Sequence, residues 1–149
     1  MPTRDEEFMS EALKLARFAE SEGEVPVGAV VVFQDQIIGR GRNSREKGAD
    51  ISGHAEINAI KDAERHLGKW TLEGCAIYVT LEPCLMCAGA IKQSRLKTIV
   101  FGAKDEAEGA IVSRYHVFDE DNANQTICIG VCGEEASALL KDFFAKRRS

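Results

Sequence analysis

Hydrophobic positions near the N-terminus recur at the spacing of an amphipathic helix. The apolar residues of this stretch are Phe8, Ala12, Leu15, Ala16 and Ala19. Thr3 and Glu6 precede them with the spacing of a capping box, in which each residue satisfies a free backbone N–H group of the other. Gly23 is a natural end for the element. The pattern therefore predicts a helix between Thr3 and Gly23.

Two β-branched, largely apolar runs follow this helix. The first is Val25 to Phe33, whose valines are typical of a buried strand. The second is IIGRGRN, residues 37–43, which follows the turn residues Gln34 to Gln36. Two strands joined by so short a turn predict an antiparallel hairpin.

The rest of the chain alternates between helical and strand patterns. We expect a helix from Ala55 to near Gly68, a strand from Cys75 to Leu81, a helix that Pro83 starts and that continues through Ile91, and a strand from Thr98 to Ala103. Because one helix joins the last two strands, they should be parallel, with a right-handed crossover.

The C-terminal part predicts one more strand and one more helix. The strand is TICIGV, residues 126–131. The helix runs from Glu134 to Arg148, and the residues expected on its core side are Leu139, Leu140, Phe143 and Phe144. Together the elements predict an α/β fold, a three-layer helix–sheet–helix sandwich around a five-stranded mixed sheet.

Composition fits one globular domain spanning residues 1–149. The hydrophobic fraction is 44% and the charged fraction 29%, and the length is usual for a single domain. No apolar stretch is long enough to span a bilayer, and charges interrupt the N-terminal apolar residues, unlike in a signal peptide. We therefore expect a cytoplasmic protein with no membrane partner. Five cysteines in such a chain favour metal binding, catalysis or burial over disulfides.

The overall charge argues against a general nucleic-acid binder. The net charge is −5 and the pI about 5.3, whereas proteins of that class are normally basic. A nucleic-acid substrate would therefore need locally concentrated positive charge. Basic residues do gather in three segments: Arg40, Arg42, Arg45 and Lys47; Lys92, Arg95 and Lys97; and Lys141, Lys146, Arg147 and Arg148.

Two short motifs carry the candidate chemistry. His54-Ala55-Glu56 has the pattern H-x-E, and Pro83 to Cys87 has the pattern P-C-x-x-C. Each is weak alone, but in this order they form the known signature of zinc deaminases. The candidate ligands are His54, Cys84 and Cys87. Three protein ligands leave the fourth position of a catalytic zinc ion open to water.

The residue types suit this chemistry. Both motifs lie at expected helix N-termini, which favour thiolate over thiol. Glu56 is only two residues from His54, so we expect it beside the metal, as the group that takes a proton from water and passes it on. Two alternatives are a closed structural zinc site, which would need a fourth protein ligand, and a redox C-x-x-C pair.

At this level of detail the sequence resembles the bacterial tRNA-specific adenosine deaminases, within the cytidine-deaminase-like superfamily. The resemblance extends from the first helix to the last and is carried by GEVPVGAV (residues 23–30), HAEINAI (54–60), YVTLEPCLMCAGAI (78–91), VFGAKD (100–105) and LLKDFFAKRR (139–148). It implies a hydrolase acting on C–N bonds that converts adenosine to inosine at the wobble position of a tRNA anticodon loop. It also implies one Zn²⁺ per subunit and a homodimer.

The resemblance further implies a set of substrate-contacting positions. Asn43 matches the asparagine that contacts the base, although a turn asparagine is the alternative. Asp105 matches an aspartate near the substrate loop. The positions implied to line the pocket are Pro26, Val27, Ala55 and Leu81.

Two segments depart from the family pattern. They are Asp50 to Gly53, just before the zinc histidine, and Asp105 to Thr126. With the acidic pI, these departures motivate a second hypothesis, a deaminase of a free base or nucleoside such as guanine or cytosine. A third is a non-catalytic zinc-bound RNA-binding module, against which the presence of Glu56 argues.

Overall fold

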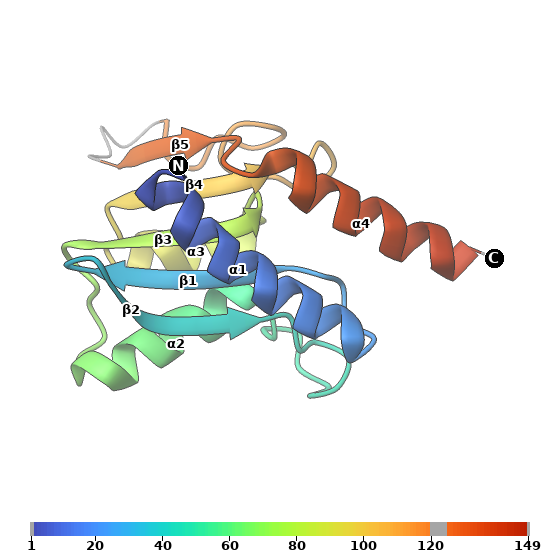
Figure 1. Cartoon of the computed structure of the whole chain (residues 1–149). Helices are drawn as coiled ribbons and strands as arrows, with labels where there is room; N and C mark the ends of the chain where they lie inside the picture. Colours follow the sequence, from blue (N-terminus) through green and yellow to red (C-terminus); the bar gives the residue numbers. More distant parts are fainter. Residues whose placement is uncertain (1, 120–124, 149) are drawn as a thin grey trace.

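A five-stranded mixed sheet forms the middle layer of the structure (Figure 1). The computed structural model describes residues 2–119 and 125–148, without the side chain of Arg148. The strands follow the order β2-β1-β3-β4-β5, with bounds β1 Gly28–Phe33, β2 Gln36–Arg42, β3 Cys75–Leu81, β4 Thr98–Ala103 and β5 Thr126–Ile129. The pairs β1–β2 and β1–β3 are antiparallel, whereas β3–β4 and β4–β5 are parallel. The predicted mixed sheet is confirmed.

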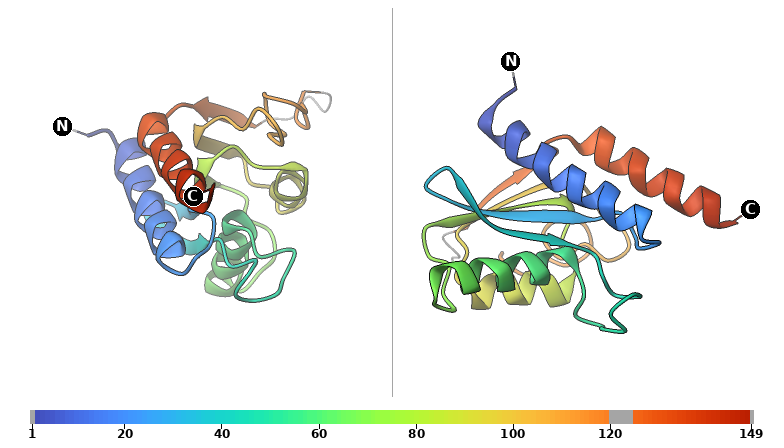
Figure 2. Two further views of the ribbon diagram at one scale, coloured as in Figure 1. Left: turned by 90° about the vertical axis from the view of Figure 1, so that its right-hand side faces the viewer. Right: turned by 60° about the horizontal axis from the view of Figure 1, so that its bottom comes forward.

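Helices cover both faces of the sheet, as expected for a three-layer sandwich (Figure 2). Helices α1 (Arg4–Ser21) and α4 (Gly133–Arg148) lie on one face, and α2 (Ala55–Leu67) and α3 (Leu85–Gln93) lie on the other. Within the described residues, none of these helices combines the length and apolar composition that crossing a membrane requires.

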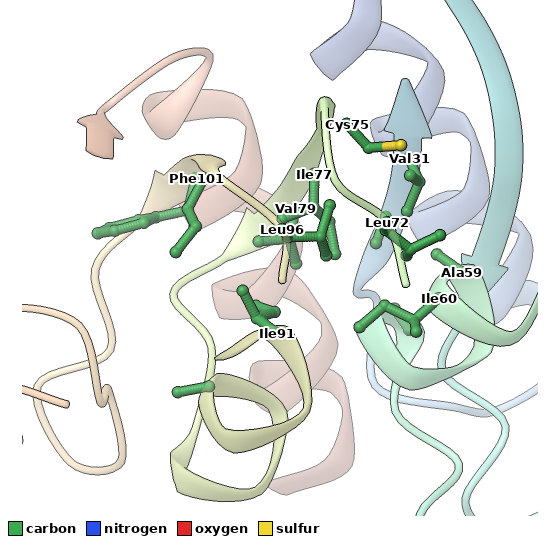
Figure 3. Close-up of a cluster of buried hydrophobic side chains, with 14 of the residues drawn as sticks. Val31, Ala59, Ile60, Leu72, Cys75, Ile77, Val79, Ile91, Leu96 and Phe101 are labelled. Carbon is green, nitrogen blue, oxygen red and sulfur yellow. The ribbon is translucent and has the colours of Figure 1, made fainter. Parts of the chain in front are cut away.

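Alternation along the strands divides the core between the two faces. In β1, Val30 and Val32 pack with Phe8 and Met9 of α1. The intervening Val31 points to the opposite side, where the larger cluster contains Ala59 and Ile60 of α2, Ile91 of α3 and Ile77 of β3 (Figure 3). Because both faces of the central strands are buried, their sequences are nearly continuous hydrophobic runs.

The β1–β2 hairpin differs from expectation at both ends. Its turn has two residues, Gln34 and Asp35, both with positive φ, so that β2 begins at Gln36 instead of within the following apolar run. At the other end, β1 begins at Gly28 and not at Val25. Pro26 has no N–H group, and the N–H of Val27 bonds to the carbonyl of Val25 across it, at 2.8 Å. The chain therefore turns before it joins the sheet.

In the helices, the structure confirms one prediction and corrects two. The capping box of α1 is present: Thr3 accepts from the N–H of Glu6 at 3.1 Å and donates its own N–H to the Glu6 carboxylate at 2.9 Å. Helix α3 begins at Leu85 after the N-cap Cys84, so Pro83 precedes the helix instead of lying in its first turn. Phe144 was expected in the core but is 44% exposed, because α4 projects beyond the edge of the sheet (Figure 1).

Glycines in β2 let helix α2 approach the sheet closely. A Cβ atom at Gly41 would overlap backbone atoms of Ala55 and Ala59, and one at Gly39 would overlap the carbonyl oxygen of Ala59. These contacts are with backbone, which cannot move without shifting the whole helix. Since α2 begins directly after His54, the close approach also places the predicted metal ligand.

The substitution Gly41→Ala is expected to lower the free energy of unfolding by about 2–3 kcal/mol, because the new methyl group has no space. The matched control is Gly89→Ala in α3, where no atom of the described residues beyond its own helix backbone and chain neighbours lies within 4 Å of the added Cβ atom. That change should raise stability by about 0.5–1 kcal/mol through helix propensity. Urea denaturation of both variants checks the pair, and a neutral Gly41→Ala would contradict the close packing.

Candidate metal centre and active site

The three predicted zinc ligands meet on the α2–α3 face of the sheet, at the end of β3. His54 is the N-cap of α2 and Cys84 is the N-cap of α3, both with extended backbone. Cys87 follows in α3 and is completely buried. Two helix N-termini therefore converge on one point, and their dipoles favour negative charge on the cysteine sulfurs.

The distances between the ligand atoms fit a metal ion. His54 Nδ1 lies 3.6 Å from Cys84 Sγ and 3.4 Å from Cys87 Sγ, and all three atoms lie within 4.8 Å of one another. A tetrahedral zinc ion with ordinary Zn–S and Zn–N bond lengths separates S and N ligands by about 3.6 Å. One imidazole nitrogen and two sulfurs are also a donor set that zinc prefers.

The surroundings of the two cysteines shift the pKa values of their thiols in opposite directions. A hydrogen bond with Cys87, followed by one with His54, lowers the pKa of the Cys84 thiol to about 3. The same hydrogen bond, together with burial, raises the pKa of the Cys87 thiol. The neighbours of Cys84 thus favour its thiolate, and zinc binding by both sulfurs would require both cysteines to be deprotonated.

Glu56 lies in the first turn of α2, beside the three ligands. Its side chain is 4% exposed, and it lines the cavity that contains His54 and Cys84. Burial raises the pKa of its carboxyl to about 7. A carboxyl with this pKa accepts and donates a proton with similar ease near neutral pH.

A cavity of about 840 Å³ opens above the ligands. Five of the six predicted substrate positions line it: Val27, Asn43, Ala55, Leu81 and Asp105. Pro26 is buried and does not line the cavity, whereas its neighbours Val25 and Val27 do. The contacts of these residues with a substrate remain predictions.

Asn43 carries an unsatisfied acceptor next to this cavity. Its side chain is 7% exposed, and its Nδ2 donates to the carbonyl of Val25 at 3.4 Å. Its Oδ1 is buried, and no group of the described residues bonds to it. An unpaired buried acceptor is costly. The Oδ1 atom is therefore explained better by a hydrogen bond from a bound ligand than by a role of Asn43 in the turn alone.

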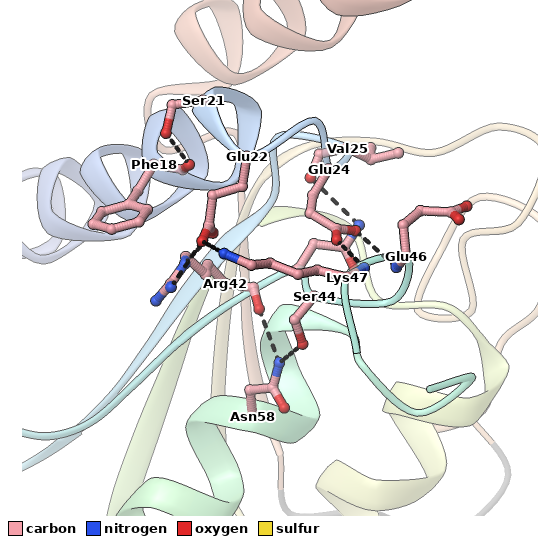
Figure 4. A network of polar contacts seen from close by, with 11 residues as sticks. Phe18, Ser21, Glu22, Glu24, Val25, Arg42, Ser44, Glu46, Lys47 and Asn58 are labelled. Atoms are coloured by element: carbon pink, nitrogen blue, oxygen red, sulfur yellow. Dashed lines mark hydrogen bonds and ion pairs between the residues drawn. The ribbon is translucent and has the colours of Figure 1, made fainter. Parts of the chain in front are cut away.

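A polar network holds the segment around Asn43 (Figure 4). The buried carboxylate of Glu24 accepts from the N–H groups of Glu46 and Lys47, at 3.0 and 2.7 Å. Asn58 of α2 donates to the carbonyl of Arg42 at 2.8 Å and to the hydroxyl of Ser44 at 3.0 Å. The loop is thus tied both to the end of α1 and to the helix that follows His54.

Comparison with known proteins places these features in a family. Residues 2–103 match the cytidine and deoxycytidylate deaminase zinc-binding region. The tRNA-specific adenosine deaminase of Haemophilus influenzae is 48% identical over 147 residues, which are 97% of this chain and 85% of that protein. The chain belongs to the tRNA-specific adenosine deaminase family of zinc-dependent deaminases. It is accordingly a hydrolytic deaminase that uses zinc.

Solved structures of two deaminases are similar in fold. One comes from a study of A-to-I editing by tRNA:A34 deaminases at the wobble position. It is 38% identical, has a TM-score of 0.86, and the match covers 90% of this chain and 99% of that one. The other is the guanine deaminase of Nitrosomonas europaea, which is 25% identical with a TM-score of 0.83, over 94% of this chain and 84% of that one.

Fewer basic side chains line the cavity of this deaminase than the three basic segments of the sequence suggested. Among the residues that the structure describes, the basic side chains lining it are Arg45 and Lys104. Arg42 instead forms an ion pair with Glu22 at 2.7 Å and lies over the ring of Phe18. Lys92 does not line the cavity. The side chain of Arg148 lies outside the part of the chain that the structure describes, and so do residues 120–124 of the divergent segment.

Sequence reasoning missed several residues of the site. Glu82, which directly precedes the P-C-x-x-C motif, is a buried carboxylate that lines the cavity. Its position among apolar residues between a strand and a metal-binding helix was the available signal. The remaining apolar lining comes from segments distant in sequence, and no local pattern unites them: Val25, Ile51, Met86, Leu140 and Phe144.

Proposed function

We propose that this deaminase converts adenosine to inosine in the anticodon loop of a tRNA. The observation that carries the proposal is one cavity holding the His54–Cys84–Cys87 cluster, the buried carboxyl of Glu56 and the unpaired Oδ1 of Asn43. The names of the similar proteins support the choice of tRNA over other substrates.

The residues divide the reaction between them. Zinc, when bound by the three ligands, supplies Lewis acidity that makes water a nucleophile near neutral pH. Glu56 takes one proton from the attacking water and delivers it to a ring nitrogen of the base; it then takes the proton of the hydroxyl that has added to the ring carbon and delivers it to the amino group, so that the C–N bond breaks and ammonia leaves. Asn43 accepts a hydrogen bond from the heterocycle edge and so orients it.

The cavity favours a substrate in which the target base is part of a larger molecule. A single-stranded loop lets the target base leave the stack and enter a pocket. The lining residues Arg45 and Lys104 supply positive charge for phosphate groups next to that base.

We also infer a homodimer and a cytoplasmic location, both from the family resemblance. Light scattering of the purified protein tests the dimer.

The decisive experiment compares substrates side by side. Zinc-loaded enzyme is incubated with a tRNA anticodon stem-loop, free adenosine, guanine and cytosine, and both ammonia and inosine are measured. We expect inosine in the stem-loop and turnover of the small molecules at least about 100-fold slower. Turnover of a free base with no inosine in any RNA would refute the tRNA assignment.

The alternative is a deaminase of a free base, with guanine as the first candidate. The structural similarity to a guanine deaminase supports it, as does the acidic rim formed by Asp105, Glu106 and Glu108, which disfavours polyanions. In the same assay, this alternative predicts ammonia from guanine and none from the stem-loop.

Loss of the Asn43 amide is expected to act on substrate binding. We expect Asn43→Ala to raise KM by about 10- to 100-fold, the range for losing a hydrogen bond to a buried group. Gln36→Ala, at the exposed far end of β2, the strand that Asn43 directly follows, is the control and should leave KM unchanged. Steady-state kinetics on the preferred substrate checks the pair, and an unchanged KM in Asn43→Ala would assign Asn43 to the turn alone.

A further inference from the structure

Glu82 is a buried carboxylate for which the deamination chemistry has no use. It lies between β3 and α3, two residues before the ligand Cys84, and is 2% exposed. Its backbone N–H bonds to the carbonyl of Ala103 at 2.8 Å, at the end of β4. Burying a charge is costly unless hydrogen bonds compensate it.

Five hydrogen-bond donors in one segment, residues 105–113, compensate the buried charge of Glu82. Oε1 accepts from the N–H of Asp105 at 3.1 Å and from the hydroxyl of Ser113. Oε2 accepts from three successive N–H groups, those of Ile111, Val112 and Ser113, at 3.1, 2.8 and 3.0 Å. Residues 105–113 therefore wrap around the carboxylate and direct their backbone dipoles at it, as in an anion-binding nest.

The fit around the carboxylate is close. A Cβ atom at Gly109 would overlap the Glu82 carboxyl group, so this position has room only for glycine. All five groups that bond to its two oxygens are N–H or O–H donors, so the Glu82 side chain acts as an acceptor at both oxygens.

The held segment forms a wall of the zinc cavity. Lys104, Asp105, Glu106 and Glu108 line the cavity on this side. The Asp105 side chain shapes the start of the segment by accepting from the N–H groups of Ala107 and Glu108, at 3.2 and 3.1 Å. At its far end, the N–H of Ala110 bonds to the carbonyl of Pro83 at 2.8 Å. The segment is therefore attached on both sides to the residues that precede Cys84.

We propose that Glu82 is a positioning residue for substrate binding: its carboxylate organises residues 105–113 and fixes the cavity wall at Lys104 to Glu108 relative to the zinc ligand Cys84. The wall and the metal centre come from different segments, and Glu82 joins them directly. This inference rests on the proposed function only in its kinetic part, since the anchoring itself is a property of the fold.

The test compares wild type with Glu82→Gln in the zinc-loaded enzyme. A glutamine amide would turn an NH₂ group toward one of the two donor sets, so some donors lose their acceptor. We expect hydrogen exchange about tenfold faster or more at the donor set that the NH₂ group faces, either the N–H of Asp105 or those of Ile111, Val112 and Ser113, with exchange in α2 and β3 unchanged. KM on the anticodon stem-loop should rise at least about tenfold and kcat change less than about threefold, with one zinc per chain retained.

Two further variants separate positioning from general destabilisation. Glu73→Gln, an exposed carboxylate before the other end of β3, should change neither exchange nor KM. Ser113→Ala removes one donor and keeps the carboxylate, so KM should rise in the same direction by about threefold. If Glu82→Gln does not fold, Ser113→Ala decides the question.

The outcomes are distinguishable from failure of the proposed function. Unchanged exchange both at Asp105 and at residues 111–113, or a loss of zinc or of kcat with KM unchanged, would overturn the positioning role. If wild type deaminates guanine or cytosine instead of the stem-loop, the tRNA assignment fails, and KM for that base replaces KM for the stem-loop. The exchange measurement needs no substrate and decides the anchoring in every case.

Discussion

Replacing Glu56 by glutamine is expected to lower kcat by about 10²- to 10⁴-fold while zinc remains bound, the range for removing a general acid–base group. Glutamine keeps the size and the buried position of the side chain but cannot take a proton from water. The carboxyl of Glu56 is 4% exposed and burial raises its pKa to about 7, so the wild-type residue exchanges protons near neutral pH. Zinc stays because the three ligand side chains are untouched.

Steady-state kinetics and metal analysis of the same preparations check this result. Glu64→Gln is the matched control, because it makes the same change in the same helix α2 at a position that does not line the cavity. It should retain wild-type kcat and one zinc per chain. Full activity in Glu56→Gln would exclude Glu56 as the proton shuttle, and loss of zinc would instead assign it to the metal centre.

Replacing Cys87 by alanine is expected to remove zinc and, with it, detectable deamination. Cys87 is completely buried, and its sulfur lies 3.4 Å from His54 Nδ1. With two ligands left, no catalytic three-ligand site can form. The variant should also lose the stabilisation that bound zinc supplies, which is about 2.7 kcal/mol when free zinc is at 100 times its Kd.

Zinc content by atomic absorption and thermal denaturation with and without zinc measure both effects. Cys75→Ala is the control, since Cys75 is 2% exposed and lies in the core away from the cavity. It should lose stability through the missing sulfur but keep one zinc and the zinc-dependent rise in Tm. A Cys87→Ala protein with full zinc content would refute the three-ligand site.

Much of the fold was predictable because its determinants are local. The helix before Gly23 follows from apolar spacing and a capping box, and β3 and β4 match the predicted bounds. The parallel pairing of β3 with β4 follows from the helix between them. The boundaries that were wrong lie at Val25, Gln36, Pro83 and Gly130, where β5 ends at Ile129 and not at the predicted Val131; in each case the flanking turns decide where regular hydrogen bonding begins or ends.

The cavity was less predictable than the metal ligands. Arg42 is adjacent in sequence to Asn43, yet its guanidinium bonds to Glu22 and does not line the cavity. Phe144 follows the helical period of the core residues, but the sheet ends before its position on α4 and leaves it exposed beside the cavity. Periodicity reports which face of a helix is apolar, and not how far the opposing layer extends.

The sequence by itself determined the reaction class, because the metal-binding residue types and the glutamate beside them lie within two short motifs whose spacing places them at helix N-termini. The tertiary structure alone decided how the pocket is built around that chemistry. The carbonyl of Val25 accepts from Asn43 Nδ2 and so holds this side chain in place, and the carboxylate of Glu82 accepts from residues 105–113 and so shapes that segment. These contacts join residues 18 to 31 positions apart, and only packing of the layers brings such segments together.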